Sequence, residues 1–128
     1  MKLITTKTHG VLDYVVGFII AASPWLFNYV KMGQETLVPV VMGAAAVLYS
    51  LLTNYEFGAI KVIQMRVHLV LDFANGVILA ASPWIFGFSD VVYLPHLILG
   101  ISEIAVVLMT EPKPRGKNAP IKKTTEME

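Results

Sequence analysis

The chain has 128 residues, of which 55% are hydrophobic and 15% are charged, and its formal net charge is +1. A soluble domain carries charge on roughly a quarter of its residues, so the composition argues against a water-soluble globular protein. The chain has no cysteine, which excludes disulfides, thiolate metal sites and thiol redox chemistry.

Four apolar stretches follow one another along the chain: Gly10 to Phe27, Leu37 to Leu52, Val67 to Phe88 and Val91 to Met109. Each comes close to the roughly 17 to 25 residues that cross the hydrocarbon core of a bilayer as a helix. The second stretch is the shortest, and it needs polar residues at its ends or slight thinning of the bilayer to span. We therefore predict an all-α four-helix transmembrane bundle with the lipid bilayer as its solvent.

The first and third stretches are copies of one another. Ten residues recur at a constant offset of 59, which is far outside chance in a chain of this length. The first set is His9, Leu12, Asp13, Gly17, Ala21, Ala22, Ser23, Pro24, Trp25 and Phe27, and the second is His68, Leu71, Asp72, Gly76, Ala80, Ala81, Ser82, Pro83, Trp84 and Phe86. Beyond the tryptophan the second copy is two or three residues shorter, since Gly43 aligns with Gly100.

The doubled Ser-Pro-Trp, with His-x-x-x-Asp upstream in each copy, resembles the SPW-repeat family of small prokaryotic integral membrane proteins. The resemblance extends over residues 4 to 110. It implies a pair of membrane helices per repeat, with the motif in the first helix, and it implies no particular activity. We accordingly predict a first repeat at residues 4–57 and a second at residues 60–110.

A repeat with two spans returns the chain to the side from which it started, so the two tandem repeats should have the same, parallel orientation. Nine of the ten Lys and Arg residues lie in the N-terminal segment, the 53–66 loop or the C-terminal tail, and only Lys31 lies on the other side. The positive-inside rule then places both termini in the cytoplasm of a multi-pass protein of the cell (inner) membrane. Residues 111–128 are rich in Pro, Lys and Glu, and we expect a disordered cytoplasmic tail.

The Ser-Pro-Trp motif also predicts local structure. Serine is a good helix N-cap and proline is preferred at the first helical position, whereas a proline inside a continuing helix removes a backbone hydrogen bond and bends the helix. In either case the first span of each repeat should kink or break near Ser23 and Ser82. The aromatic side chains that follow should form a belt at the outer membrane interface. They are Trp25, Phe27 and Tyr29 in the first copy and Trp84, Phe86 and Phe88 in the second.

A polar stripe runs along the first helix of each repeat. His9, Asp13, Gly17 and Ala21 are four residues apart, so they share one face, and the second copy repeats the arrangement. Because small residues let helices approach closely, we expect this face to point into the bundle and the two copies to meet there. Glu103 in the last stretch lies at a similar depth.

The candidate metal ligands are therefore His9, Asp13, His68, Asp72 and Glu103. Ionisable residues inside a bilayer are costly and often functional. One interpretation is a His-Asp clamp that holds the helices together. A second is a site for Zn²⁺ or a similar divalent cation, or a proton pathway, because imidazole and carboxylate are suitable ligands. A third is a haem held by His9 and His68. His96, which has no counterpart in the first repeat, is expected to be an interfacial polar residue.

The sequence contains no nucleophile-base set, phosphate loop or dinucleotide fingerprint, so we expect no enzyme and no cofactor. The leading interpretation is a non-enzymatic structural or accessory membrane protein. The alternative is a small divalent-cation or proton pathway built on the His/Asp/Glu layer in the cytoplasmic half. We expect no nucleic-acid partner, and the small-residue surface left on the helices is suited to a homo-oligomer.

Overall fold

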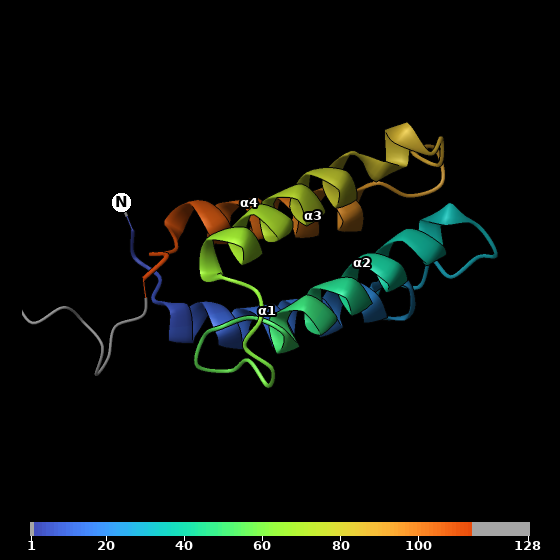
Figure 1. Ribbon diagram of the computed structural model, residues 1–128. Coiled ribbons are helices and arrows are strands. Elements are labelled where there is room, and N and C mark those ends of the chain that lie inside the picture. The colour runs from blue at the N-terminus through green and yellow to red at the C-terminus, as the bar shows by residue number, and fades with distance from the viewer. Residues whose placement is uncertain (1, 114–128) are drawn as a thin grey trace, which may run out of the picture.

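Four helices form a single bundle in the computed structural model, which describes residues 2–113 (Figure 1). They are α1 (Thr6–Leu26), α2 (Gln34–Leu51), α3 (Met65–Ile85) and α4 (Leu94–Met109). α1 packs mainly against α2, and α3 mainly against α4. The all-α four-helix bundle with two helices paired in each repeat is thus confirmed. Most of the predicted disordered tail, residues 114–128, lies outside the described residues.

Three helices, α1, α2 and α3, are long and apolar enough to cross a membrane. The shortest is α4, with 16 residues, and not α2, which begins already at Gln34. Polar residues at the start of α2 lengthen the second stretch, as expected, whereas the fourth stretch gives the shortest helix. The reason is Pro95, which lies in the first turn of α4, where a residue without an N–H is tolerated. The apolar residues before Leu94 remain in the preceding connection.

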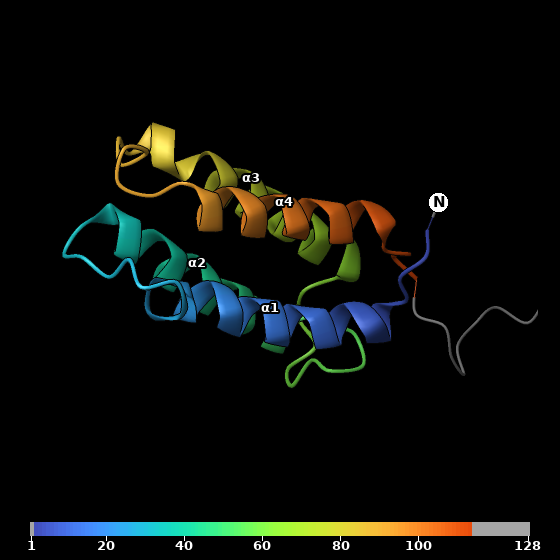
Figure 2. The same cartoon turned by 180° about the vertical axis from the view of Figure 1, so that it is seen from behind.

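At one end of the bundle, equivalent residues of the two repeats make equivalent contacts with the other repeat. α1 and α3 both begin at this end, where the 52–64 connection and the end of α4 also lie (Figures 1 and 2). Isolated parallel bridges join Ile4 to Thr110 and Ile63 to Thr53. Ile63 is the repeat equivalent of Ile4 at the offset of 59, and each bridge joins one repeat to the other. We call this end the His/Asp end, because the ionisable residues described below lie near it.

Small residues let the helices of each repeat touch through their backbones. A Cβ atom built on Gly43 of α2 would lie 2.5 Å from the backbone nitrogen of Ala21 and 2.5 Å from the backbone oxygen of Gly17 in α1. Gly100 of α4 meets Ala80 and Gly76 of α3 at the same distances. The glycine and alanine part of the predicted stripe therefore packs within each repeat, whereas its histidine and aspartate part reaches the other repeat.

The Ser-Pro pair lies inside the last turn of the helix. α1 continues through Pro24 to Leu26 and α3 through Pro83 to Ile85, so of the two interpretations the continuing helix is the one observed, and Ser23 is not an N-cap. Pro24 cannot donate to the carbonyl of Ile20 four residues earlier, but the Ser23 hydroxyl donates to that carbonyl at 2.7 Å. Ser82 repeats the contact with the carbonyl of Leu79 at 2.7 Å. The serine thus replaces the hydrogen bond that the following proline removes.

The hydrogen bond from the Ser23 hydroxyl to the Ile20 carbonyl predicts the effect of Ser23→Ala. The variant leaves the buried Ile20 carbonyl without a donor, which should lower the free energy of unfolding by about 1–3 kcal/mol. In a Pro24→Ala background the same change should cost much less, because the new backbone N–H can bond Ile20. Ser102→Ala is the matched control, since the exposed Ser102 hydroxyl donates to Ile98. Urea unfolding in detergent measures the free energy of unfolding of the four variants. If Ser23→Ala costs the same with Pro24 as in the Pro24→Ala background, the serine hydroxyl does not replace the hydrogen bond that the proline removes.

The aromatic belt is only partly as predicted. Trp25, Phe27, Trp84 and Phe86 are exposed, as a belt requires. Phe88 is 5% exposed and packs with its ring centroid 4.9 Å from that of His96, and Tyr29 approaches the same ring at 5.3 Å. His96 is buried, and its Nε2 donates to the backbone oxygen of Glu35 at 3.0 Å, so the expectation of an interfacial His96 is wrong. It links α4 to α2 at the end opposite the His/Asp end.

Candidate functional site

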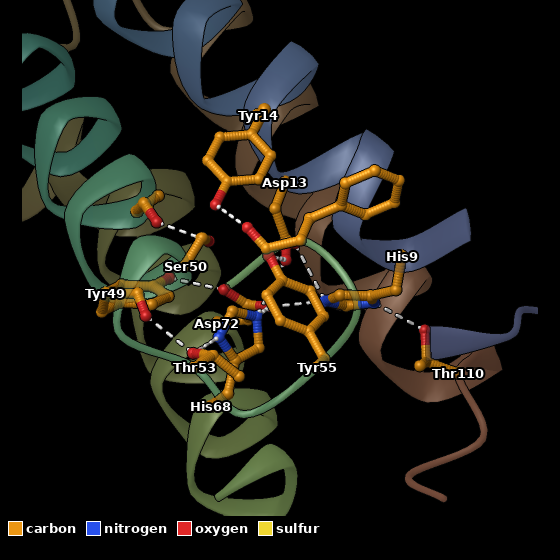
Figure 3. Close-up of polar contacts among 12 residues, drawn as sticks. His9, Asp13, Tyr14, Tyr49, Ser50, Thr53, Tyr55, His68, Asp72 and Thr110 are labelled. Carbon is orange, nitrogen blue, oxygen red and sulfur yellow. Dashed lines mark hydrogen bonds and ion pairs between the residues drawn. The ribbon is translucent and has the colours of Figure 1, made fainter. Parts of the chain in front are cut away.

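Two histidines and two aspartates from α1 and α3 converge near the His/Asp end (Figure 3). One ligand atom from each of His9, Asp13, His68 and Asp72 lies within 4.8 Å of all the others. We call these four residues the His₂Asp₂ cluster. Their side chains are 0–7% exposed, so the cluster lies in the interior although His9 is in the first turn of its helix.

The contacts in the cluster are nearly symmetric. His9 Nε2 lies 2.9 Å from Asp13 in its own helix and 2.8 Å from Asp72 across the repeats. His68 Nε2 lies 3.0 Å from Asp72 in its own helix and 3.0 Å from Asp13 across the repeats. Each imidazole therefore directs Nε2 at both carboxylates, as a pseudo-two-fold axis through the cluster requires. The structure thus brings the His-Asp pairs of the two copies together, as expected.

Two threonines determine which nitrogen of each ring carries a proton. Thr110 Oγ1 donates to the carbonyl of Val106 at 2.6 Å, so its contact of 2.8 Å with His9 Nδ1 requires Nδ1–H to be the donor. Thr53 Oγ1 donates to the carbonyl of Tyr49 at 2.7 Å and stands 2.7 Å from His68 Nδ1. Both Nδ1 atoms are thus protonated, and in the neutral rings both Nε2 atoms present lone pairs to the cluster.

Lone pairs that face carboxylate oxygens at about 3 Å repel them unless a positive charge lies between. That charge is either a proton on each Nε2 or a cation that all four groups share. His9 Nε2 makes a hydrogen bond to Asp72 Oδ2 at 2.8 Å, whereas the buried Nε2 of His68 has no partner with hydrogen-bond geometry among the described residues. The contacts of His68 are close enough for electrostatic attraction but are directed toward the centre of the cluster. The nitrogen–oxygen distances of 2.8–3.0 Å are those of hydrogen-bonded ion pairs, and the convergence of the four groups on one point also allows them to share a cation.

Two tyrosines fix the carboxylates from the outside. The hydroxyl of Tyr49 in α2 donates to Asp72 Oδ1 at 2.5 Å, and that of Tyr55 in the 52–64 connection donates to Asp13 Oδ2 at 2.9 Å. Burial and the neighbouring Asp13 carboxylate raise the pKa of Tyr55, so its phenol stays protonated and remains a donor. Each ligand side chain therefore has a second partner that orients it, as in known metal centres.

The sequence interpretation missed all four of these supporting residues. A signal was present for the threonines, because Thr53 and Thr110 are 57 residues apart, the offset that also relates Gly43 to Gly100. No repeat signal exists for the tyrosines, since Val106 and Pro112 stand at the equivalent positions.

Glu103 lies beside the cluster rather than in it. Its side chain is buried in α4, and Oε1 accepts a hydrogen bond from Asn75 Nδ2 of α3 at 3.2 Å. A small cavity separates it from the cluster and is lined by both, with His9, Asp13 and Asp72 on one side and Glu103 on the other. Of the five predicted ligands, the structure brings four together and leaves the fifth across this cavity.

The geometry bears on what the cluster could bind. Two imidazole nitrogens and two carboxylate oxygens form a four-ligand set of the kind that holds Zn²⁺ and related divalent ions. The rings of His9 and His68 meet edge to face with their centroids 5.4 Å apart, which leaves no room for a porphyrin between them. A bis-histidine haem therefore does not fit this arrangement.

Comparisons with known proteins give one result at the level of a family. The chain matches the SPW repeat domain over residues 7–110, which include the whole His₂Asp₂ cluster and both Ser-Pro-Trp motifs. No curated protein and no solved structure matches the chain.

Proposed function

Because the chain belongs to the SPW repeat family, is built of apolar helices and encloses four converging ligands, we propose that it is a non-enzymatic membrane protein that binds one divalent metal ion. The observation that carries the proposal is the pair of imidazoles whose Nδ1 protons are held by Thr53 and Thr110, so that both Nε2 atoms face two carboxylates. Two neutral imidazoles, two carboxylates and one divalent cation sum to zero charge, which suits a buried site.

The bilayer arrangement is part of the same proposal. All four helices cross the membrane, the two repeats lie parallel about an axis along the membrane normal, and the His/Asp end faces the cytoplasm. The support is the distribution of charge, since nine of the ten Lys and Arg residues are in segments assigned to that side. The metal then lies in the cytoplasmic half of the bundle, between the two repeats, where its binding energy also holds the repeats together.

A His-Asp clamp without metal is the second candidate, and the hydrogen bond from His9 to Asp72 favours it. In that state each Nε2 carries a proton and the two ion pairs alone join α1 to α3. A metal site requires four nitrogen and oxygen atoms to converge on one point, as they do here, and the Nε2 of His68, 3.0 Å from both carboxylates, makes no hydrogen bond of good geometry to either. We therefore prefer the metal site.

The deciding experiment measures metal directly. Protein purified in detergent, stripped with a chelator and reloaded with Zn²⁺ should carry one ion per chain by native mass spectrometry and elemental analysis. His68→Gln should lose the ion, whereas His96→Gln, which replaces a buried histidine outside the cluster, should keep it. Zn²⁺ at about 100 times its dissociation constant should also stabilise the wild-type protein by about 2.7 kcal/mol. Folded wild-type protein that takes up no Zn²⁺, Co²⁺ or Mn²⁺ would contradict the metal site and leave the clamp.

The threonines give a test of the tautomer assignment. Thr53→Val with Thr110→Val keeps the side-chain shape and removes the acceptors of both Nδ1 protons, so each ring is free to turn or change tautomer. Loss of the hydrogen-bond partner that orients a metal-binding histidine typically weakens metal binding about 10–100-fold. A competition titration with a chromophoric chelator measures the change, and Thr36→Val is a control at the opposite end of the bundle. Unchanged affinity would show that the threonines do not orient the ligands.

A further inference from the structure

The two repeats are not equivalent around the His₂Asp₂ cluster. Tyr49 in α2 fills the space beside Asp72 with its ring and donates its hydroxyl to that carboxylate. At the offset of 57, the residue equivalent to Tyr49 is Val106 in α4. Val106 is smaller and has no hydroxyl, and a cavity lies at this place in the structure. The cavity therefore occupies the position where the other side of the cluster has a phenol.

The cavity has the size and the lining of a water site next to the cluster. Its volume is about 30 Å³, measured as the space open to the centre of a water molecule, and a single water needs roughly 10–15 Å³ on that measure. Three of the four cluster residues line it, namely His9, Asp13 and Asp72. A molecule in the cavity would thus lie beside the ligands on the α4 side, whereas His68 does not contribute to the wall.

Glu103 provides an independent indication that the cavity holds a ligand. Its side chain is 9% exposed, and Oε2 has no hydrogen-bond partner among the described residues, although Oε1 is bonded to Asn75. A buried carboxyl oxygen without a partner costs about 1–3 kcal/mol or more, so such oxygens normally face water or an ion. The equivalent residues of the first repeat are Ala46 in place of Glu103 and Val16 in place of Asn75, and both of them line the same cavity. The polar pair is therefore present in the second repeat only, and its Glu103 lines the cavity.

From these observations we propose that the cavity between Glu103 and the His₂Asp₂ cluster holds an exchangeable ligand of the bound metal, a water molecule whose hydrogen bond Glu103 Oε2 accepts. This inference rests on the proposed metal site and specifies its class. Closed four-ligand sites are typical of structural metals, whereas a position filled by water is typical of sites at which the metal or its ligands exchange. One coordination position of the bound ion is then open to exchange with solvent.

The seam between α1 and α4 is where exchange would take place. These two helices contact one another less than the other neighbouring pairs of helices do. Ser102, which also lines the cavity, is exposed on the α4 side of the seam. Deeper in the bundle, the apolar cluster of Ile20, Val38, Leu79 and Phe88 closes the interior. A small ligand can thus reach the metal through the cavity, from the side on which Ser102 is exposed.

Cobalt provides a test of the coordination number. Co²⁺ bound by the wild-type protein should show the weak visible absorption of a five-coordinate ion. Val106→Phe fills the cavity as Tyr49 fills the other side, and it should give the much stronger bands of a tetrahedral ion. Leu108→Phe, at an exposed position of the same helix, is the matched control and should leave the spectrum unchanged. A tetrahedral spectrum in the wild type that is the same in Val106→Phe would overturn the water ligand.

A second variant tests the role of Glu103 without filling the cavity. Glu103→Gln keeps the shape but offers the water an amide instead of a carboxylate. The rate at which Zn²⁺ passes to an excess of chelator should change on the order of 10-fold, because outer partners of metal ligands have effects of that size. Glu35→Gln at the other end of the bundle should have no effect. An unchanged rate with Glu103→Gln would contradict the inference even if Zn²⁺ binds, whereas a wild-type protein that binds neither Zn²⁺ nor Co²⁺ would contradict the proposed function itself.

Discussion

The double variant Asp13→Asn, Asp72→Asn is expected to fold normally and to lose its metal. An amide oxygen is neutral, so two of the four ligands lose the charge that balances a divalent cation. Loss of a residue that only hydrogen-bonds to a ligand costs about 10–100-fold in affinity, so the removal of two charged ligands should weaken binding more than about 100-fold. The amide N–H₂ groups can donate to the histidine Nε2 atoms, so the buried polar groups remain satisfied. Native mass spectrometry with elemental analysis, alongside a melting curve of the metal-free protein, measures both effects.

The same variant separates the metal site from the clamp. Removing the charged partners of a clamp leaves any buried imidazolium unpaired, and breaking a buried ion pair typically costs about 3–5 kcal/mol. A metal-free variant that melts like the metal-free wild type, combined with metal in the wild type only, supports the site. A variant that melts far lower, with no metal in either protein, supports the clamp. Asp90→Asn replaces an exposed aspartate near the end of the bundle opposite the His/Asp end. It is the control for an amide substitution that affects neither the metal site nor the clamp.

Much of the fold could be predicted because it follows from patterns along the chain. Long apolar stretches predict the helices, and the offset of 59 predicts that the second pair copies the first. The ends of the helices were harder to predict, because apolar residues such as Val91 and Val92 belong equally well to a helix or to a turn. Which backbone group the Ser23 side chain bonds was also not predictable. A serine before a proline is a reasonable N-cap in isolation, and only its contact with Ile20 shows that it completes a helix that has already formed.

The centre of the site was predictable for a similar reason. His9 and Asp13 lie four residues apart on one helix, and a duplication makes the second pair meet the first wherever the repeats pack about a common axis. The threonines and tyrosines come from α2, the 52–64 connection or the residue after α4, and Asn75 of α3 contacts Glu103 of α4, so all of these contacts depend on the tertiary packing. Spacing along one helix carries no information on such contacts. Glu103 was assigned to the same layer because of its depth along the bundle. Depth does not determine the position of a residue around the bundle axis, and in the structure Glu103 is separated from the cluster by a cavity.

The packing of the glycines predicts the largest loss of stability in the protein. Gly43→Val should separate α1 from α2, because the new Cβ would meet backbone atoms of Gly17 and Ala21 at 2.5 Å. Backbone atoms cannot rotate away as a side chain can, so the cost should lie at or above the upper end of the range for overpacked sites, about 3 kcal/mol. Gly100→Val should have a similar effect on the second repeat, since its contacts with Gly76 and Ala80 are equivalent. Thermal or denaturant unfolding in detergent measures both.

The comparison that makes this result specific is Ala44→Val, the next residue along α2. Ala44 is exposed on the outside of the bundle, so the added methyl groups of valine meet lipid or detergent there instead of a helix. Both substitutions introduce a β-branched side chain into the same helix, and the intrinsic helix propensity of valine therefore contributes to both. The expected order is a large loss for Gly43→Val and a change within about 0.5 kcal/mol for Ala44→Val. Equal effects would mean that the close approach of α1 and α2 is not what stabilises the repeat. The His₂Asp₂ cluster would then lack the rigid support that its geometry requires, because α1 positions two of its four ligands.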